Sequence, residues 1–521
     1  MLTTNSLMIE QSNKTRTIAK NTGFLYIRMI FVALVGLYTS RVVLQVLGVE
    51  DFGTYNLVAS LVVMFLFLKM ALTNATYRFL AYDLGAGVED NLKKTFSMSI
   101  NIHVLLTIVI IILSECIGPW YIGNMMKIDP SRIYAAQVLF QLSLLGFATD
   151  TIMVPYNSLI VAHEHMNFYA LTSIVEVILK LLIVFLLPIA PFDKLIFYGF
   201  LTACVRFVIF IWMAIYDKLH FSECQYVKGW DSNLFKKLVN YSGLSLIVNM
   251  IDIAVVQSIG IFFNMFYGLV ANAAYGIANQ VNGVLQNFVN NFSQSYNPQI
   301  IKSYAAKQFE YFHKLIHTAS KISFLMYFCV AFPILLNINF ILKIWLVDPP
   351  LLTDQFLYCI VVLSIFDALG APMWNSVYAT GNIKTHQLLM GGIKILNIPL
   401  SYILLINNAP IVWVLVVYAS LNGVCWFVRT IYLKTLINFD VKLYFRDVIL
   451  KSLITVFVSA VPTLFLCSFI QNDIVKLFAS TLFFETSFLL SGYNIGLNYG
   501  EKELVLSLVK GALDKLIGRA R

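Results

Sequence analysis

Eleven asparagine and glutamine side chains, and no charged ones, occur between Ala271 and Ile300, a stretch long enough to cross a membrane. Six polar positions recur within it at intervals of three and four residues, which is the period of an α-helix. We predict that they form one polar stripe that lines a water-filled cavity and hydrogen-bonds hydroxyl-rich ligands such as sugars. The stripe consists of Asn279, Asn282, Gln286, Asn290, Ser293 and Asn297.

Hydrogen bonding between helices is the alternative explanation of this stripe. Such contacts contribute roughly 0.6 kcal/mol each inside a bilayer. They would account for one or two amides, because a buried polar group needs a partner. Six positions in register along roughly 30 Å of helix favour the cavity.

Ionisable residues inside predicted membrane segments are the second group of candidates, because a charge there is costly and indicates function by default. Asp252 lies near the middle of a segment and shares a helical face with Asn249. We predict that both line the cavity and that Asp252 is a candidate for binding a coupling ion. The alternative for Asp252 is a carboxylate that is hydrogen-bonded between helices.

Arg28 and Arg41 lie in the inner and outer thirds of the first segment, roughly 140° apart around a straight helix. Each one either contacts an anionic ligand or extends its side chain to the membrane surface. A spacing of four predicts a pair within one helix for Glu176 and Lys180. Other charges inside segments include Lys69, Glu115, Asp150, Arg206, Asp367, Lys394 and Arg429.

Nucleotide, metal and cofactor chemistry find little support. The GxxxxGK[ST] pattern of nucleotide-binding loops does not occur in the sequence. His313 and His317 have the spacing of a metal pair, and 163–165 reads His-Glu-His, but neither group has further ligands nearby. The seven cysteines form no CxxC pair. We therefore expect no metal, no cofactor and no enzymatic activity.

The elements that would position these residues are transmembrane helices. The 521 residues are 59% hydrophobic and 12% charged, with a mean hydropathy of +0.78, which is typical of a polytopic membrane protein. We count fourteen apolar runs of roughly 17 to 25 residues. Their centres lie near residues 35, 64, 105, 146, 177, 204, 254, 285, 327, 367, 397, 421, 459 and 485. The predicted class is therefore all-α with about 14 transmembrane helices.

Basic residues predict the orientation of these helices. With the N-terminus in the cytoplasm, 24 Lys and Arg residues fall on the inner side, 5 on the outer side and 7 within segments. This bias predicts that both termini face the cytoplasm. The net charge of +9 then needs no nucleic-acid partner, because basic loops beside anionic inner-leaflet lipids account for it. The first 21 residues are polar, so we expect no cleavable signal peptide.

The chain also shows an internal repeat. An offset of 220 places Gly48 on Gly268 and Tyr55 on Tyr275, and hydrophobic segments 1 to 6 fall on segments 7 to 12. Six helices per half give two lobes that enter the membrane in the same direction, as a parallel repeat. The predicted divisions are a leader (1–21), a first lobe (22–220), a loop between the lobes (221–240), a second lobe (241–434), an added helix pair (448–496) and a basic amphipathic cytoplasmic tail (497–521).

One stretch of sequence resembles a known family. After Asn21-Thr22-Gly23 comes the run from Ser40 to Asn56, which contains the pattern Leu-Gly-x-x-x-Phe-Gly-x-Tyr from Leu47 to Tyr55. This pattern and the arrangement of segments resemble bacterial polysaccharide transporters of the O-antigen flippase type. These belong to the multidrug/oligosaccharidyl-lipid/polysaccharide (MOP) exporter superfamily.

The resemblance implies a central cavity between two six-helix lobes of a protein of the cytoplasmic (inner) membrane. Alternating access would move an undecaprenyl-diphosphate-linked oligosaccharide, such as an O-antigen or capsule repeat unit, from the inner to the outer leaflet. Cavities in the family tend to be cationic, which Arg28 or Arg41 would supply. Implied partners are the lipid-linked oligosaccharide, membrane lipids, a coupling ion (H⁺ or Na⁺) and proteins of polysaccharide assembly.

Three alternatives stay open. An ion-coupled multidrug exporter and a peptidoglycan-precursor flippase would share the fold. A membrane glycan polymerase or ligase would be an enzyme, and such enzymes generally need acidic residues on a sizeable outer loop. The outer loops here are short, and the first offers only Glu50-Asp51.

Overall fold

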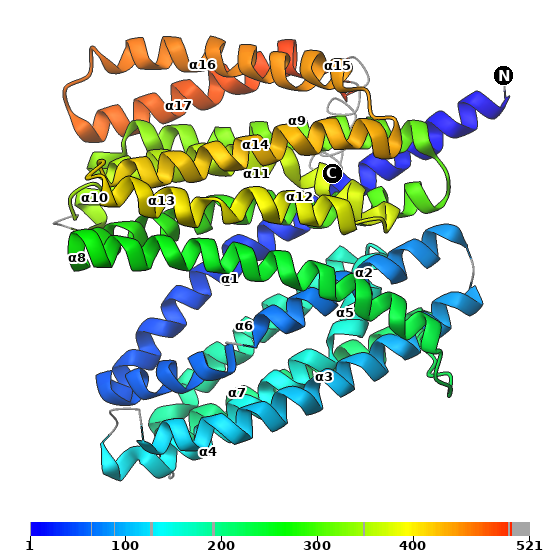
Figure 1. Cartoon of the computed structure of the whole chain (residues 1–521), viewed down its shortest axis with the longest axis vertical. Helices are drawn as coiled ribbons and strands as arrows, with labels where there is room; N and C mark the ends of the chain where they lie inside the picture. Colours follow the sequence, from blue (N-terminus) through cyan, green and yellow to red (C-terminus); the bar gives the residue numbers. More distant parts are fainter. Residues whose placement is uncertain are drawn as a thin grey trace, which may run out of the picture. The chain divides into compact units, whose positions relative to one another are not determined.

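The structure is a computed structural model that describes residues 2–63, 65–87, 89–124, 129–189, 193–346, 350–498 and 501–502. Every regular element within these residues is a helix (Figure 1). The helices form two compact units, of which unit 2 contains 23–249 and unit 1 contains 1–22 and 250–521. Helices α1 (Leu2–Val63) and α8 (Ser232–Ala305) each run from one unit into the other.

Unit 2 is a helical bundle in which α4 and α7 lie side by side. Its core contains apolar side chains of α1, α3, α4 and α7, such as Val58, Ile110, Leu139 and Leu195. Besides parts of α1 and α8, the unit comprises α2 (Leu66–Ala86), α3 (Glu89–Asn124), η1 (Pro130–Arg132), α4 (Ile133–Ile152), α5 (Val154–Ala162), α6 (Met166–Leu186), η2 (Leu187–Ile189) and α7 (Lys194–His220).

Unit 1 is a second bundle, in which α11 packs between α9 and α14. Its core joins both halves of α8 to these helices, with Phe263, Tyr327 and Phe356 buried together. The unit comprises α9 (Phe309–Leu336), α10 (Ile338–Leu346), α11 (Thr353–Thr380), α12 (Lys384–Ile395), α13 (Asn397–Ile406), α14 (Val412–Ile437), α15 (Val441–Tyr444), the π-helix η3 (Phe445–Leu450), α16 (Lys451–Cys467), α17 (Asp473–Ser491) and the π-helix η4 (Gly492–Gly496).

Eleven helical stretches of the described residues are long and apolar enough to cross a membrane. Together with their all-helical architecture, this confirms a multi-pass membrane protein. The predicted segments centred near 35, 64 and 285 are not among the eleven. The first lies in α1, the second spans the end of α1 and the start of α2, and the third lies in α8, where eleven amides lower the hydropathy.

Gly48 interrupts α1. Its φ of 82° and ψ of 170° lie in a region that is essentially restricted to glycine, and helical backbone continues on both sides. The helix therefore changes direction at this residue. The predicted cytoplasmic leader is not separate from this element, because helix α1 already begins at Leu2. At the end of that leader, the Thr22 hydroxyl lies 2.8 Å from the hydroxyl of Ser295 within unit 1.

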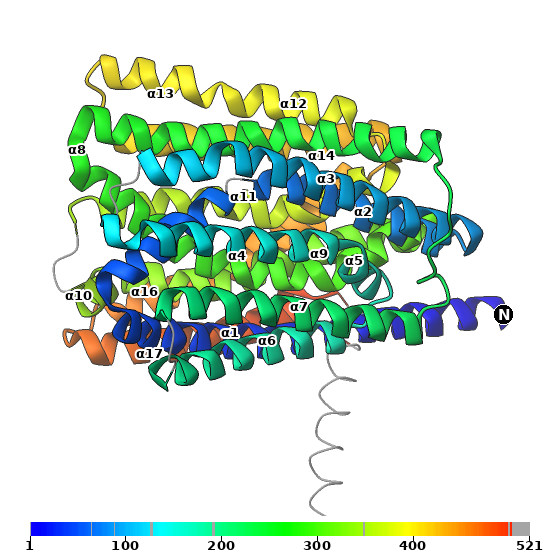
Figure 2. The ribbon, with the colours of Figure 1, turned by 90° about the horizontal axis from the view of Figure 1, so that it is seen from below.

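Helix α8 also reverses direction, although its 74 residues are assigned as one helix. The rings of Phe263 and Tyr275 lie 5.3 Å apart, whereas twelve residues of straight helix would separate them by about 18 Å. Figure 2 shows the helix bending beside its label. The runs centred near 254 and 285 are therefore two antiparallel segments. Helix α8 begins at Ser232, inside the loop predicted for 221–240.

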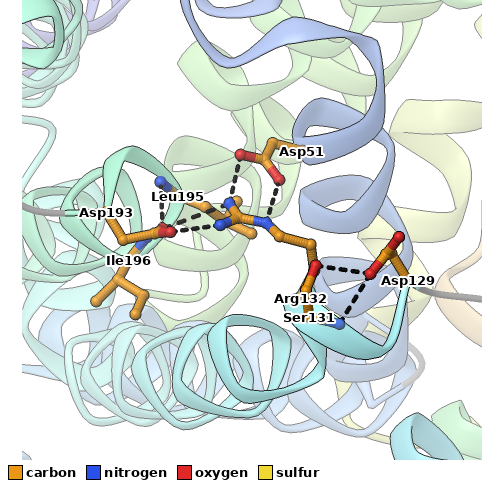
Figure 3. A network of polar contacts seen from close by, with 7 residues as sticks. All are labelled: Asp51, Asp129, Ser131, Arg132, Asp193, Leu195 and Ile196. Carbon is orange, nitrogen blue, oxygen red and sulfur yellow. Dashed lines mark hydrogen bonds and ion pairs between the residues drawn. The ribbon is translucent and has the colours of Figure 1, made fainter.

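One arginine links three parts of unit 2, namely η1, α1 and the residue that precedes α7 (Figure 3). Arg132, at the start of α4, donates to Asp51 on α1 at 2.8 Å and to Asp193 at 2.5 Å. Asp193 also caps α7 by accepting the backbone N–H groups of Leu195 and Ile196. Burial raises the pKa of Asp193, but the hydrogen bond and charge of Arg132 and the backbone N–H groups of Ile196 and Leu195 together outweigh this and hold the pKa below its ordinary value. The network therefore stabilises the end of the bundle where α1, α4 and α7 meet.

Candidate functional site

The polar stripe lies on the second half of α8, and part of it joins the helices of unit 1. The Asn282 Oδ1 atom accepts hydrogen bonds from the hydroxyls of Tyr327 on α9 (3.2 Å) and Ser364 on α11 (2.8 Å). Asn297 Oδ1 accepts another from Asn375 Nδ2 on α11 at 2.5 Å. Bonding between helices, the alternative raised by the sequence, therefore accounts for these two amides.

Two further members of the stripe form bonds within α8 itself. The Ser293 and Tyr296 hydroxyls lie 2.7 Å apart, and Ser293 is buried. The Asn279 Nδ2 atom donates to the backbone carbonyl of Tyr275 at 3.1 Å. These side chains satisfy part of their hydrogen-bonding capacity without a ligand.

Gln286 and Asn290 differ from the other four. Among the described residues, neither side chain has a hydrogen-bond partner. Gln286 is half-buried and Asn290 is exposed, and they lie one helical turn apart on the same face. Each amide offers two N–H donors and a carbonyl acceptor. This pair is therefore the part of the stripe that is available to a ligand.

Asp252, on the first half of α8, forms an ion pair. Its Oδ1 atom lies 2.6 Å from Lys394 Nζ on α12, and the Asp252 side chain is 40% exposed. A carboxylate bonded between helices, the alternative considered for Asp252, is the arrangement found here. The coupling-ion role remains a prediction. Asn249 is half-buried three residues earlier and belongs to unit 2.

A second cation of unit 1 lies deep in its core. Arg429 on α14 is 5% exposed and donates to His386 Nε2 on α12 at 3.1 Å. A side chain at position 370 would approach its guanidinium to 2.5 Å, so Gly370 makes room for it. Asp252, Asp367, Lys394 and Arg429 carry two negative and two positive formal charges, and this group is therefore neutral as a whole.

Unit 2 contains a cluster of intramembrane charges with an excess of cations. Glu176 lies 2.6 Å from Lys180, as the spacing predicts, and 3.0 Å from Arg206. Arg206 also lies 3.4 Å from Asp150. Arg28 and Lys69, from α1 and α2, extend the cluster. Two acids and four bases give it a formal charge of +2, and we call these six residues the unit 2 charge cluster.

Two cations of this cluster have no acidic partner at ion-pair distance among the described residues. The Arg28 guanidinium lies over the Tyr169 ring at 4.8 Å, and its Nε atom is buried without a hydrogen bond. The Lys69 ammonium lies 5.7 Å from the Phe147 ring centre. Both charges are free to bind an anion. The side chain of Arg41, the other predicted arginine, lies outside the described residues.

Every member of the unit 2 charge cluster is a candidate in the sequence, but apart from the pair of Glu176 with Lys180 the sequence does not group them. The available signal is depth, because Lys69, Asp150, Glu176 and Arg206 all lie within five residues of the centre of a predicted segment. Charges at one depth in neighbouring helices can meet. Which helices are neighbours depends on packing, and that is why the grouping needed the structure.

Comparisons with known proteins agree with this architecture. The MatE family model matches residues 245–403. No curated protein matches the chain. Similar solved structures include a MATE protein in the bent conformation (14% identical, TM-score 0.70) and a MOP superfamily transporter from Pyrococcus furiosus Vc1 (DSM3638) (13%, TM-score 0.70). An outward-facing multidrug resistance MATE family transporter of the MOP superfamily is similar too (14%, TM-score 0.68).

Each of these matches covers 82% of this chain and 96% of the other one. At such low identity the likeness shows a shared fold. The fold and the family match agree with the prediction that the chain is not an enzyme. The MatE match falls on the turn of α8 and on the helices that hold Asp252 and the stripe, so this part of the chain is similar to the MatE family and the described fold is MATE-like.

Proposed function

We propose that the chain is a flippase that moves an undecaprenyl-diphosphate-linked oligosaccharide, such as an O-antigen or capsule repeat unit, to the outer leaflet of the cytoplasmic membrane. One observation carries the proposal: unit 1 presents the available amides Gln286 and Asn290, whereas the unit 2 charge cluster has an excess of cations. Amides suit sugar hydroxyls, and cations suit a diphosphate. The two kinds of group therefore match the two polar parts of one lipid-linked substrate.

The free-energy cost of moving the polar part of the substrate across the bilayer favours alternating access. Moving a sugar chain and a diphosphate through hydrocarbon would cost on the order of tens of kcal/mol. The lipid tail has no such cost, since it stays in the bilayer. A cavity that opens to each face in turn and sideways to lipid meets both demands. Many replaceable hydrogen bonds would bind the sugar and still allow its release.

The proposal includes a parallel repeat of two six-helix lobes, 22–220 and 241–434, with both termini in the cytoplasm. The positions of the two turns support it. The first turn lies at Gly48, and the second lies between Phe263 and Tyr275, a range that contains 268, the position predicted by an offset of 220. Helices α16 and α17 would be an addition to this repeat.

A multidrug exporter is the second candidate, and the fold shared with a multidrug resistance MATE transporter favours it. Such an exporter would bind hydrophobic cations with aromatic and acidic groups. Asp252 would then be its ion-binding residue, although Lys394 neutralises it in this structure. A peptidoglycan-precursor flippase would share the polar groups as well as the fold.

Deleting the gene and following the lipid-linked oligosaccharide tests the proposal. We expect the undecaprenyl-linked repeat unit to accumulate on the cytoplasmic side of the membrane. Complementation with the wild-type gene is the control and should restore the surface glycan. Accumulation on the periplasmic side would instead indicate a polymerase or ligase. Unchanged glycan with increased drug sensitivity would favour the multidrug exporter.

A further inference from the structure

The last membrane helix contains a carboxyl group at mid-depth. Glu485 lies twelve residues after the start of α17 at Asp473 and eleven residues before Gly496, where the predicted span ends. These separations correspond to about 18 Å and about 17 Å of helix. The hydrocarbon core of a bilayer is about 30 Å thick. A helix that crosses it therefore places Glu485 near the middle.

Among the residues that the structure describes, one side chain forms a hydrogen bond with Glu485. Cys329 Sγ on α9 donates a hydrogen bond to its carboxyl at 2.9 Å. The helices meet here through aromatic rings, for example Phe332 on α9 and Phe484 on α17, whose centres lie 4.5 Å apart. The Glu485 side chain is half-buried at the edge of this contact.

No cation within the described part of the chain lies at ion-pair distance from Glu485. On α9, Lys321 is eight residues from Cys329, about 12 Å along the helix, and pairs with Glu501. On α16, Lys451 lies at the inner end and pairs with Asp447. On α17 itself, Lys476 is nine residues away, about 14 Å, and Asp473 is farther still. Lys321 and Lys451 therefore lie toward one end of these helices, and Asp473 and Lys476 lie toward the other.

A negative charge at this depth would be unusually costly. An ionised carboxylate in hydrocarbon needs a counter-charge or water, and a thiol is only a weak donor. A proton on the carboxyl would remove this cost. We propose that Glu485 is a proton-binding site within the membrane-spanning part of α17.

The site lies outside the groups assigned to the substrate. The unit 2 charge cluster, the amides of α8 and Asp252 all belong to helices before α16. A proton at Glu485 gives the added helix pair a titratable group of its own. The inference therefore does not depend on the identity of the substrate.

A hydrophobic carbodiimide, applied to the full-length protein in lipid nanodiscs, tests the proposal. A protonated carboxyl adds across one C=N bond of the reagent: its oxygen bonds to the central carbon, and its proton moves to nitrogen. The adduct then rearranges to a stable N-acylurea that retains every atom of both reactants. We expect mass spectrometry to find this adduct on Glu485, with about tenfold less labelling at about pH 9 than at about pH 6.

Three variants make the test decisive. Glu485→Gln should remove the label from its peptide. Cys329→Ala should increase labelling at high pH, since the thiol favours the ionised form by donating to it. Leu482→Glu places a carboxyl at a 69% exposed position one turn away and shows whether the reagent reaches this depth. Labelling of that variant with none at Glu485 would overturn the proposal. So would labelling that is independent of pH, or equal labelling by a water-soluble carbodiimide.

Discussion

Single residues of α8 differ in what they bind, although the sequence presents them as one stripe. Asn282 accepts two hydrogen bonds from neighbouring helices, whereas Gln286 and Asn290 have no partner among the described residues. The first is needed for packing. The other two are available to a ligand, so substitutions at the two kinds of position should have different effects.

Replacing Gln286 and Asn290 together with Leu should abolish surface glycan export and leave the protein inserted and abundant. No hydrogen bond within the described structure is lost, but the sugar loses its partners. Asn287→Leu removes an exposed amide one position off the stripe and should preserve export. Glycan staining and immunoblotting measure the two outcomes. Unchanged export in the double variant would refute the cavity assignment.

Asn282→Leu should act on stability instead. It leaves the hydroxyls of Tyr327 and Ser364 without their acceptor, and each buried unpaired group costs about 1–3 kcal/mol.

The cations of unit 2 should act on the diphosphate. Arg28→Gln and Lys69→Gln should each lower the affinity for an undecaprenyl-diphosphate lipid about tenfold, since a hydrogen bond to a charged group contributes about 1.5–3 kcal/mol. Lys180→Gln is the matched control, because that ammonium already pairs with Glu176. Microscale thermophoresis with the purified protein measures the affinities. Equal losses in all three variants would show that only the net charge matters.

Individual helices owe their shape to a few special positions. Gly48 allows α1 to change direction, since its backbone lies in a region that is essentially closed to other residues. Asp193 and Asn472 cap the N-termini of α7 and α17 with their side-chain oxygens. The local shape of each helix therefore follows from residues that the sequence shows directly.

Gly48→Ala should destabilise the protein by about 1–3 kcal/mol. The space around Gly48 is open within 4 Å, so the cost is conformational and not steric. Gly36→Ala, at a helical position with equally open surroundings, should be neutral or slightly stabilising. Thermal unfolding in detergent compares the two variants. A Gly48→Ala protein as stable as the wild type would exclude a requirement for glycine at this turn.

An ion pair and a hydrogen bond join α9 to Glu501, which follows the last helix pair. Lys321 is 1% exposed, and its ammonium lies 2.6 Å from Glu501, which also accepts a hydrogen bond from Thr318 at 2.9 Å. Glu501→Gln should cost about 3–5 kcal/mol, because it leaves a buried cation without an acid. Adding Lys321→Met to that variant should recover most of the loss.

Lys451→Gln is the control for this pair, since Lys451 is 31% exposed beside Asp447 and should contribute at most about 1 kcal/mol. Thermal unfolding of the wild type, Glu501→Gln, Lys321→Met and the double variant gives the coupling energy. A double variant as unstable as Glu501→Gln alone would show that the ion pair is not the source of the effect.

The sequence predicts local features of these elements better than distant ones. Helical class and the pair of Glu176 with Lys180 follow from periodicity and a spacing of four. The pair of Asp252 with Lys394 joins residues 142 positions apart, and its formation depends on how α8 packs against α12. No periodic pattern encodes that choice.

The whole molecule is a multi-pass protein with a MATE-like fold and an uneven distribution of polar groups. Unit 2 has a cluster with a formal charge of +2, whereas in unit 1 the charges of Asp252, Asp367, Lys394 and Arg429 cancel, and a row of neutral amides lies on α8. Such a division suits a cargo with a charged diphosphate and an uncharged glycan. A hydrophobic cation would gain little from either group.

The central claim is that the chain moves a lipid-linked oligosaccharide between leaflets. Purified protein in liposomes that contain the fluorescent undecaprenyl-diphosphate oligosaccharide tests it most directly, with an external glycosidase that reaches only the outer leaflet. Protein-free liposomes should protect about half of the lipid, because the two leaflets hold similar amounts. The account predicts near-complete digestion with the wild-type protein and about half with the Gln286→Leu, Asn290→Leu variant. Protection of half the lipid by wild-type liposomes would contradict it.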